Sequence, residues 1–326
     1  MTDAEALALA VQAAKHWGGC LPEFGAPRLI KNRENAVFEV AFPDAEAALR
    51  LHRLGYQSEA AIRSELWWVT ELALAGLPVA LPLVTQARDL VADLGGGQIA
   101  SAILWVEGAA IGAGGVPLAQ SAARQAEIHH GLGRLLAQIH RVTDGLTPPA
   151  RFERPDWRLE GLLGETPFWG RFWEHPGLSA TEAAVLRAAR SFARARLQSY
   201  GGSQGLIHAD VIRENVLDHD GRLTLIDFDD CGFGYRMYDL GTALRDNLTE
   251  PHLPAIHAAL IEGYSEVCPI SAQDRAMLPV FVLLRTLASV GWAMPRLAAD
   301  DPGALAHIAR AVRTARIIMD GGDLFS

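Results

Sequence analysis

Cysteine is scarce in this sequence, with only three among 326 residues. Cys20, Cys231 and Cys268 are odd in number and far apart, and none has the spacing of a metal-binding motif. Three scattered cysteines cannot build a disulfide-rich scaffold, and this usage suits a reducing compartment.

Long hydrophobic runs are also lacking. The apolar stretch at residues 72–84 is short and is interrupted by a glycine and two prolines, which argues against a membrane span. Neither terminus has the basic start and apolar run of a signal peptide. We therefore expect a cytoplasmic protein with no membrane partner.

The sequence also has fewer basic than acidic residues. The 29 Lys and Arg residues face 38 Asp and Glu residues, so the net charge of −9 argues against general nucleic-acid binding. Only two of the basic residues are lysines, Lys15 and Lys31. The length of 326 residues allows one two-lobed domain or two small ones, and half of the residues are hydrophobic, which is enough for a sizeable core. No pattern in the sequence sets the oligomeric state.

The rest of the chain is organised around residues 206–230. Residues 206–207 are typical of a short buried strand, and the loop that follows carries His208 and Asp210. Asn215 comes five residues after Asp210, immediately before the start of a second apolar strand. The sequence thus places three polar side chains between two strands.

A hairpin follows this loop. The pair Asp220 and Gly221 predicts a two-residue turn, and the returning apolar strand at residues 223–226 leads directly to Asp227. A loop, a hairpin and an acidic turn in this order form the layout of a kinase catalytic core.

The chemistry of phosphoryl transfer explains these residue types. The protein mainly positions groups and neutralises charge, so we expect Asp210 to orient an attacking hydroxyl and to take its proton. Magnesium prefers hard oxygen ligands, which Asn215 and Asp227 can supply. We expect His208 to hold the loop by hydrogen bonds. ATP and Mg²⁺ are therefore the predicted cofactors.

A phosphatase with an aspartate nucleophile is a rival interpretation. Residues 224–229 also form an apolar strand followed by Asp, any residue and Asp. That chemistry requires a later lysine, and no lysine follows Lys31. Taken singly, each polar residue of the loop would be an ordinary turn or cap residue, but their joint spacing favours the kinase interpretation.

The first hundred residues show strand and helix patterns. A helix is expected at about 3–16, and Ser58 is placed to cap a second helix that ends near Gly76. Five strands are expected, at residues 27–34, 35–42, 46–54, 88–94 and 98–106.

Longer helical patterns dominate the remainder. Helices are expected at about 118–142, 179–198, 252–265, 271–294 and 302–319. Residues 144–178 are irregular and contain six aromatic side chains within 152–173. We expect these aromatics mainly to pack the segment onto the lobe, and the alternative is that some line the acceptor pocket.

The stretch from Ile226 to Gly234, followed by Tyr238, Asp239 and Leu240, resembles the kinase-like phosphotransferase superfamily. This superfamily includes aminoglycoside phosphotransferases, choline kinases and type II homoserine kinases. The stretch is most similar to bacterial proteins near the stress response kinase, and the similarity covers nearly the whole chain.

The resemblance implies an α+β fold of the bilobal protein-kinase type. The N-terminal nucleotide-binding lobe would comprise residues 1–107, with a five-stranded antiparallel sheet and a helix. The catalytic and acceptor-binding lobe would comprise residues 108–326 and be mainly helical. Asp239 would support the catalytic loop from the start of a helix.

The resemblance also implies residues that bind the nucleotide. Arg33 and Asn35 lie where kinases fold a glycine-rich loop over phosphates, although this turn has no glycine. Trp105 and Glu107 lie at the hinge where backbone groups hold adenine. The resemblance further implies a cation on the third strand that meets the ATP phosphates. In this sequence that residue is Arg50, fifteen residues before its expected partner Glu65.

The sequence therefore predicts an ATP- and magnesium-dependent phosphotransferase acting on a hydroxyl group of a small molecule. Amino alcohols, hydroxy amino acids, sugars and aminoglycosides are the acceptor classes considered. Only eleven residues separate Asp227 from Asp239, too few for the activation segment of ordinary protein kinases. A protein Ser/Thr kinase and a nucleotide-binding regulator without turnover remain the alternatives.

Overall fold

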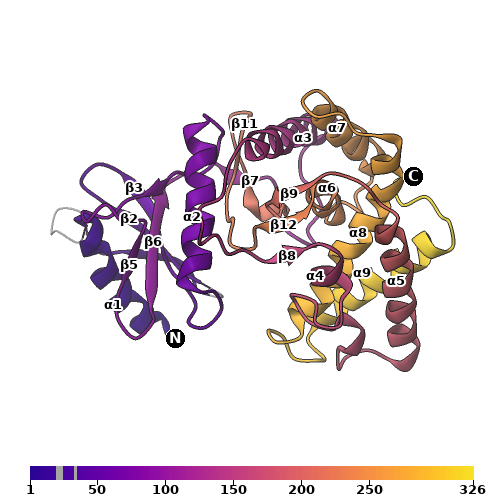
Figure 1. Ribbon diagram of the computed structural model, residues 1–326, viewed down its shortest axis with the longest axis horizontal. Coiled ribbons are helices and arrows are strands. Elements are labelled where there is room, and N and C mark those ends of the chain that lie inside the picture. The colour runs from indigo at the N-terminus through magenta and orange to yellow at the C-terminus, as the bar shows by residue number, and fades with distance from the viewer. Residues whose placement is uncertain (20–24, 33–34) are drawn as a thin grey trace. The chain divides into compact units, whose positions relative to one another are not determined.

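The computed structural model describes residues 1–19, 25–32 and 35–326. It forms two compact units, which Figure 1 shows in ribbon form. The first unit contains Met1–Gly108, Leu146–Arg154 and Thr224–Asp229, and the second contains Ala109–Gly145, Pro155–Leu223 and Asp230–Ser326. The two later segments of the first unit were not predicted. The assignment of nucleotide binding to residues 1–107 and of acceptor binding to residues 108–326 stays a prediction.

The first unit is built on a six-stranded antiparallel sheet in the order β1-β2-β3-β6-β4, with β5 also paired to β6. The strands are β1 (Arg28–Asn32), β2 (Ala36–Ala41), β3 (Glu46–Leu51), β4 (Pro82–Leu83), β5 (Val91–Asp93) and β6 (Ile99–Leu104). Five of them correspond to the predicted strands. The sixth, β4, has two residues and is too short to show an alternating pattern.

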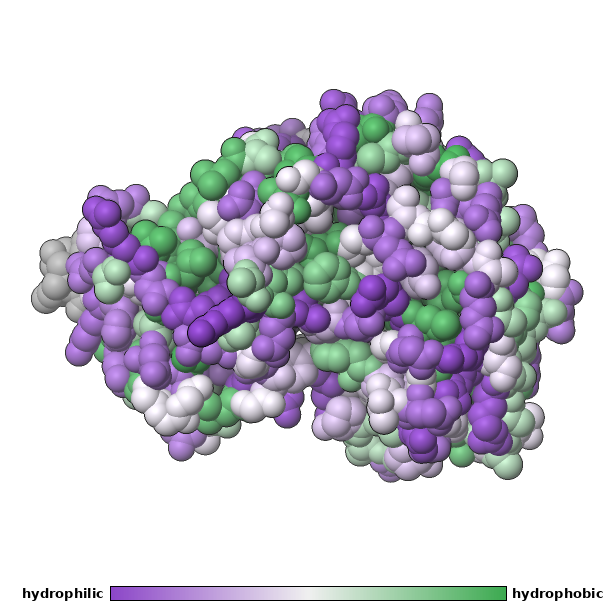
Figure 2. Space-filling model, viewed as in Figure 1, coloured by the Kyte–Doolittle hydropathy of each residue, from purple (hydrophilic) through white to green (hydrophobic). Residues whose placement is uncertain are grey.

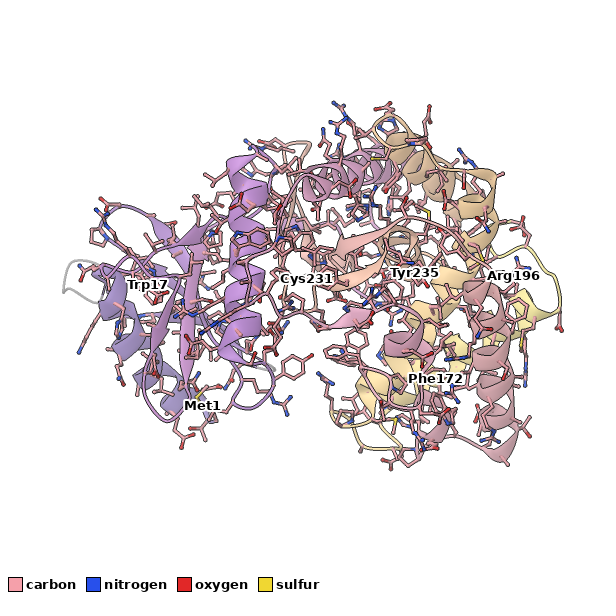
Figure 3. All side chains as sticks on the ribbon, viewed as in Figure 1. Met1, Trp17, Phe172, Arg196, Cys231 and Tyr235 are labelled. Carbon is pink, nitrogen blue, oxygen red and sulfur yellow. The ribbon has the colours of Figure 1, made fainter. Side chains whose placement is uncertain are left out.

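Two helices cover opposite faces of this sheet (Figure 1). The alanine-rich α1 (Asp3–Ala14) packs on the face that carries Leu49 and Leu51 of β3. Trp17, labelled in Figure 3, follows α1 and stacks on Phe42. The helix α2 (Glu59–Leu74) packs on the other face. Because side chains alternate along a strand, Arg50 points toward the α2 face.

The second unit is mainly helical, as predicted. Its helices are α3 (Ala122–Asp144), α4 (Leu159–Leu163), α5 (Ala180–Gln198), α6 (Arg236–Arg245), α7 (Leu253–Ser265), α8 (Ala272–Ala293) and α9 (Pro302–Met319). A small sheet in the order β8-β12-β9 joins Asp156–Trp157, Gly232–Tyr235 and Gln204–Ile207. The strands β7 (Ala109–Ala110) and β10 (Val216–His219) pair with each other, and β11 (Arg222–Leu225) runs from this unit into the first.

The irregular segment 144–178 is packed by its aromatic residues. Trp157, Trp169, Phe172 and Trp173 are buried, whereas Phe168 is 41% exposed. Trp157 contacts Trp169 edge to face, with ring centroids 4.8 Å apart. The predicted packing role therefore holds for most of these side chains.

The helix α8 is long and apolar enough to cross a membrane by length and composition alone. However, most of it is buried inside the protein, as expected for the core helix of a globular unit. On the face shown in Figure 2, hydrophobic residues are interspersed with hydrophilic ones.

His129 of α3 should make stability depend on pH. Its Nδ1 lies 2.7 Å from the Gln125 carbonyl oxygen, and its Nε2 lies 3.2 Å from Nδ2 of Asn247. Burial lowers the pKa of His129 from 6.5 to about 4. The unfolded chain therefore takes up a proton at higher pH than the folded chain, so stability should fall as the pH drops from 6.5 toward 4.

We expect this residue alone to remove up to about 3 kcal/mol of the unfolding free energy across that window. Urea unfolding at about pH 7 and about pH 5 measures the change. The His129→Gln variant should show a smaller drop between the two pH values, and His219→Gln, at an exposed position of β10, should behave like the wild type. An equal drop in all three proteins would contradict the prediction.

Candidate active site

The loop after β9 is held by an aspartate of α6. Ala209 has a left-handed backbone, with φ at 65°. The Asp239 carboxylate accepts hydrogen bonds from the backbone N–H groups of His208 (2.9 Å) and Ala209 (2.7 Å). These bonds satisfy two buried backbone donors and hold the loop in this conformation. The supporting position predicted for Asp239 is confirmed.

Asp239 is itself fixed by α3. It is fully buried, and its Oδ2 lies 3.0 Å from Nε2 of His140, whose Nδ1 lies 2.9 Å from the Tyr264 hydroxyl. His208 is also fully buried, and its Nδ1 accepts a hydrogen bond from the backbone N–H of Asp210 at 3.2 Å. His208 therefore makes a loop-holding contact of the kind predicted, while its role in turnover stays a prediction.

Asp239→Asn should destabilise the second unit. An amide cannot accept hydrogen bonds at both side-chain positions, so one of the two backbone N–H groups would lose its acceptor in a buried site. We expect a loss of about 2–3 kcal/mol in unfolding free energy, measured by urea denaturation. Asp156→Asn is the control, because Asp156 pairs with Arg158 at the surface and such pairs contribute about 1 kcal/mol or less. Equal losses in both variants would contradict the supporting role.

The Asp210 side chain has two partners. Nδ2 of Asn215 donates to its backbone oxygen (2.9 Å) and to Oδ2 (3.0 Å). Nη2 of Arg285, from α8, donates to Oδ1. Sequence reasoning brought Asp210 and Asn215 together but missed Arg285. Its available signal was that it is the one charged residue in the mainly apolar stretch 276–293 of α8.

A buried ion pair fixes the short helical turn Arg213–Asn215. Nη2 of Arg213 donates to Oε1 of Glu250 at 2.6 Å and to Oδ1 of Asn247 at 2.7 Å. Both charged side chains are less than 5% exposed. Sequence reasoning did not find this pair, which anchors the turn that presents Asn215.

The hairpin turn has the predicted form. Asp220 and Gly221 have φ values of 50° and 89°, and positive φ at both central residues defines the type I′ turn that suits a two-residue hairpin. The chain then continues through β11 to Asp227, which is also left-handed, with φ at 63°.

In the first unit, three carboxylates lie around the guanidinium of Arg50. Its Nη1 donates to Oε1 of Glu65 at 2.8 Å and lies 3.6 Å from Oδ1 of Asp229, and its Nη2 donates to Oδ1 of Asp227 at 3.4 Å. Burial opposes the charge on Arg50, but the Glu65, Asp227 and Asp229 carboxylates raise its pKa above the ordinary value. The structure thus contains the predicted pairing of Arg50 with Glu65.

Asp229 is the most perturbed carboxyl of this cluster. Burial, together with the Glu65 charge, raises its pKa to about 7, although Arg50 opposes the shift. Nδ2 of Asn35 donates to its Oδ2 at 3.2 Å, and Nε2 of Gln57 donates to its backbone oxygen at 2.6 Å. Among the sequence-based interpretations, only the phosphatase one gave Asp229 a role.

The other predicted nucleotide-binding residues are placed as follows. The Asn35 amide is engaged by Asp229 and by the backbone N–H of Arg53, which donates to its Oδ1 at 3.0 Å. The Trp105 backbone N–H donates to the Glu46 oxygen at 2.9 Å, and Glu107 is exposed. Arg33 lies outside the described residues. The nucleotide-binding roles of these side chains stay predictions.

Asp227 of the first unit and Asn215 of the second unit each offer an oxygen of the kind that magnesium prefers. The Asp227 side chain is 38% exposed. Asn215 uses its Nδ2 on Asp210, and within the described part of the chain its Oδ1 accepts no hydrogen bond, which leaves a hard oxygen. No cluster of three or more His, Cys, Asp or Glu residues suited to a metal occurs among the described residues. Magnesium commonly takes one or two protein ligands together with substrate phosphates.

Comparisons with known proteins identify the family and the fold. Residues 26–278 match a family described as "Phosphotransferase enzyme family". The structure of a microcompartment-associated aminopropanol kinase superposes with a TM-score of 0.81 and 29% identity, covering 97% of this chain and 99% of that one. The complex of the amicoumacin kinase hAmiN with AMP-PNP, Ca²⁺ and Ami has a TM-score of 0.77 at 20% identity, covering 99% and 96%. The predicted kinase-like α+β fold is confirmed.

Two relatives found by sequence are also kinases. Amicoumacin kinase of Bacillus subtilis is 24% identical over 277 residues, which cover 81% of this chain and 78% of that protein. Homoserine kinase of Polaromonas naphthalenivorans is 30% identical over 208 residues, covering 56% of this chain and 60% of that one.

Proposed function

Because the chain belongs to the phosphotransferase enzyme family, we propose that it transfers the γ-phosphoryl group of ATP to a hydroxyl group of a small molecule. The predicted superfamily and the kinase class of enzyme are confirmed by this membership. The observation that carries the proposal is the Asp210 carboxylate, which Asn215 and Arg285 hold beside a loop fixed by Asp239.

In the second unit, Asp210 orients the acceptor hydroxyl and takes its proton as the bond to phosphorus forms. The hydrogen bonds from Asn215 and Arg285 restrict the rotation of its carboxylate, so one geometry is prepared before the acceptor binds. Asn215 and Asp227 are the residues that would hold Mg²⁺. When bound, the ion neutralises charge on the phosphate oxygens.

In the first unit, Arg50 supplies positive charge to the ATP phosphates, and Glu65 orients its guanidinium. Arg33 and Asn35 belong to the turn proposed to cover the phosphates. The hinge residues Trp105 and Glu107 are the proposed adenine contacts, through their backbone groups. These assignments follow the sequence-based predictions and are part of the proposal.

A small acceptor is supported by the segment between Asp227 and Asp239. Its strand β12 pairs antiparallel with β9 and parallel with β8. Part of the segment therefore forms a strand within a sheet, whereas protein kinases use this part of the chain for an activation loop. We propose a cytoplasmic enzyme whose partner is this small molecule, with no nucleic acid and no membrane.

An ATP-consumption screen tests the proposal. The acceptors are amino alcohols, hydroxy amino acids, sugars, aminoglycosides and generic protein substrates, each with Mg²⁺ and with Asp210→Asn as the inactive control. We expect acceptor-dependent consumption with at least one small compound. Phosphorylation of protein alone would favour the protein kinase alternative, and ATP binding with no turnover on any acceptor would favour the regulator.

A further inference from the structure

Arg285 is a buried cation with unused hydrogen-bond donors. Its side chain is 6% exposed, and its guanidinium lies over the Trp169 ring at 4.8 Å from the centroid. Nη2 donates to Asp210, but Nε and Nη1 are buried and have no hydrogen-bond partner among the described residues. A buried guanidinium with unmatched N–H groups is costly, so this arrangement requires a reason.

Two neighbouring side chains have the same property. Nε1 of Trp169 and the hydroxyl of Tyr238 are buried and, within the described chain, make no hydrogen bond. Both pack against Trp157. Trp157 meets Trp169 edge to face and stacks on Tyr238 with ring centroids 5.7 Å apart. Burial raises the pKa of Tyr238, while the Arg285 charge and the approach of its guanidinium to the hydroxyl oxygen oppose the shift, so the Tyr238 hydroxyl keeps its proton. All three side chains can therefore donate hydrogen bonds.

The other nearby carboxylates do not accept hydrogen bonds from Nε or Nη1 of Arg285. Asp246 is shared by Arg245, whose Nη1 donates to it at 2.5 Å, and by Arg310 at 3.6 Å. Asp230 lies near enough to raise the pKa of Arg285, against the effect of burial. Even so, Nε and Nη1 stay unmatched. The missing partner is thus rich in hydrogen-bond acceptors, and it is not supplied by the residues described around the guanidinium.

We propose that Arg285, Trp169 and Tyr238 form an anion-binding subsite beside Asp210, and that the phosphate acceptor is a small hydroxy acid whose carboxylate is held there. The inference rests on the proposed function. Each unmatched N–H group of the guanidinium can donate a charge-assisted hydrogen bond to a carboxylate oxygen. Because Arg285 also touches Asp210, the carboxylate and the reacting hydroxyl must be only a few bonds apart in the acceptor.

Matched pairs of acids and amides test the subsite. The pairs are glycolate and glycolamide, lactate and lactamide, serine and serinamide, and homoserine and homoserinamide. For at least one pair, kcat/KM should favour the acid by about 10- to 100-fold, the range expected when hydrogen bonds to a charged group are lost. Arg285→Met should abolish this preference, and Arg285→Lys should keep part of it.

Arg296→Met is the matched control, because Arg296 also lies over a tryptophan, at 4.9 Å from the Trp292 ring, and should keep the preference. Binding of propanoate and butanoate, against propanamide and butanamide, provides a readout that needs no turnover. Calorimetry should detect the acids with the wild type and with Arg296→Met but not with Arg285→Met. A thermal melt of each variant shows that it is folded.

The outcomes separate the inference from the proposed function. Absence of any acceptor-dependent turnover would remove the proposed function. Turnover of amides or amino alcohols at least as fast as of acids, together with no acid binding, would overturn the subsite and leave the kinase activity standing. If Arg285→Met lowers kcat equally for acids and amides and still binds the acids, Arg285 acts by orienting Asp210 alone, and the subsite is again overturned.

Discussion

Asp210→Asn is expected to lose roughly 10²- to 10⁴-fold in turnover, the contribution typical of a general base, while ATP and Mg²⁺ still bind. Asparagine keeps the size of the side chain and a hydrogen-bonding oxygen, but it cannot take a proton from the acceptor. Asp227→Ala is expected to behave differently, because it removes a proposed metal ligand. It should weaken the magnesium-dependent part of nucleotide binding.

Calorimetry with ATP, with and without Mg²⁺, distinguishes the two variants. Asp220→Asn is a suitable control, because Asp220 has a left-handed backbone at the hairpin turn and asparagine tolerates that conformation. It should keep both turnover and binding. Equal loss of ATP affinity in Asp210→Asn and Asp227→Ala would contradict the assignment of base and metal ligand.

Arg50→Ala is expected to lose roughly 10²- to 10³-fold in catalytic efficiency toward ATP, as when one preorganised charge-stabilising donor is removed. The variant lacks the cation for the phosphates, and it leaves Glu65, Asp227 and Asp229 without their shared partner. Arg50→Lys should retain partial activity, because a point charge replaces the planar fork. Glu65→Ala should cost less than Arg50→Ala, since Glu65 orients the cation without touching ATP.

Steady-state kinetics in ATP measures these differences. Arg28→Ala is the control, because Arg28 also lies on a strand of the first unit but is 65% exposed and pairs with Glu39 at the surface. Its catalytic efficiency should equal that of the wild type. An Arg50→Ala enzyme with unchanged efficiency toward ATP would remove Arg50 from the site.

Local patterns were enough to predict much of the structure. Alternation along β3 correctly placed Arg50 opposite the buried Leu49 and Leu51. The capping role of Ser58 is confirmed, since its hydroxyl accepts a hydrogen bond from the backbone N–H of Ala61 at 3.0 Å. The Asp220 and Gly221 turn also formed as predicted. In each case the signal lies within a few residues of the feature that it specifies.

Features that depend on distant partners were missed. The strand β12 has two glycines among its four residues and exists through its pairing with β9 and β8. Arg213 and Arg285 become informative only when the fold brings Glu250 and Asp210 to them. A single arginine in a sequence carries no sign of which carboxylate it will meet, so these contacts could not be predicted from local patterns.

The most direct test of the central claim is to follow the terminal phosphate of ATP. The purified protein is incubated with γ-labelled ATP, Mg²⁺ and a mixture of small hydroxyl compounds, and the products are separated by size and charge. We predict that the label enters a small phosphomonoester with the wild type and that Asp210→Asn abolishes this transfer. Label found only on protein, or only in inorganic phosphate, would contradict the account.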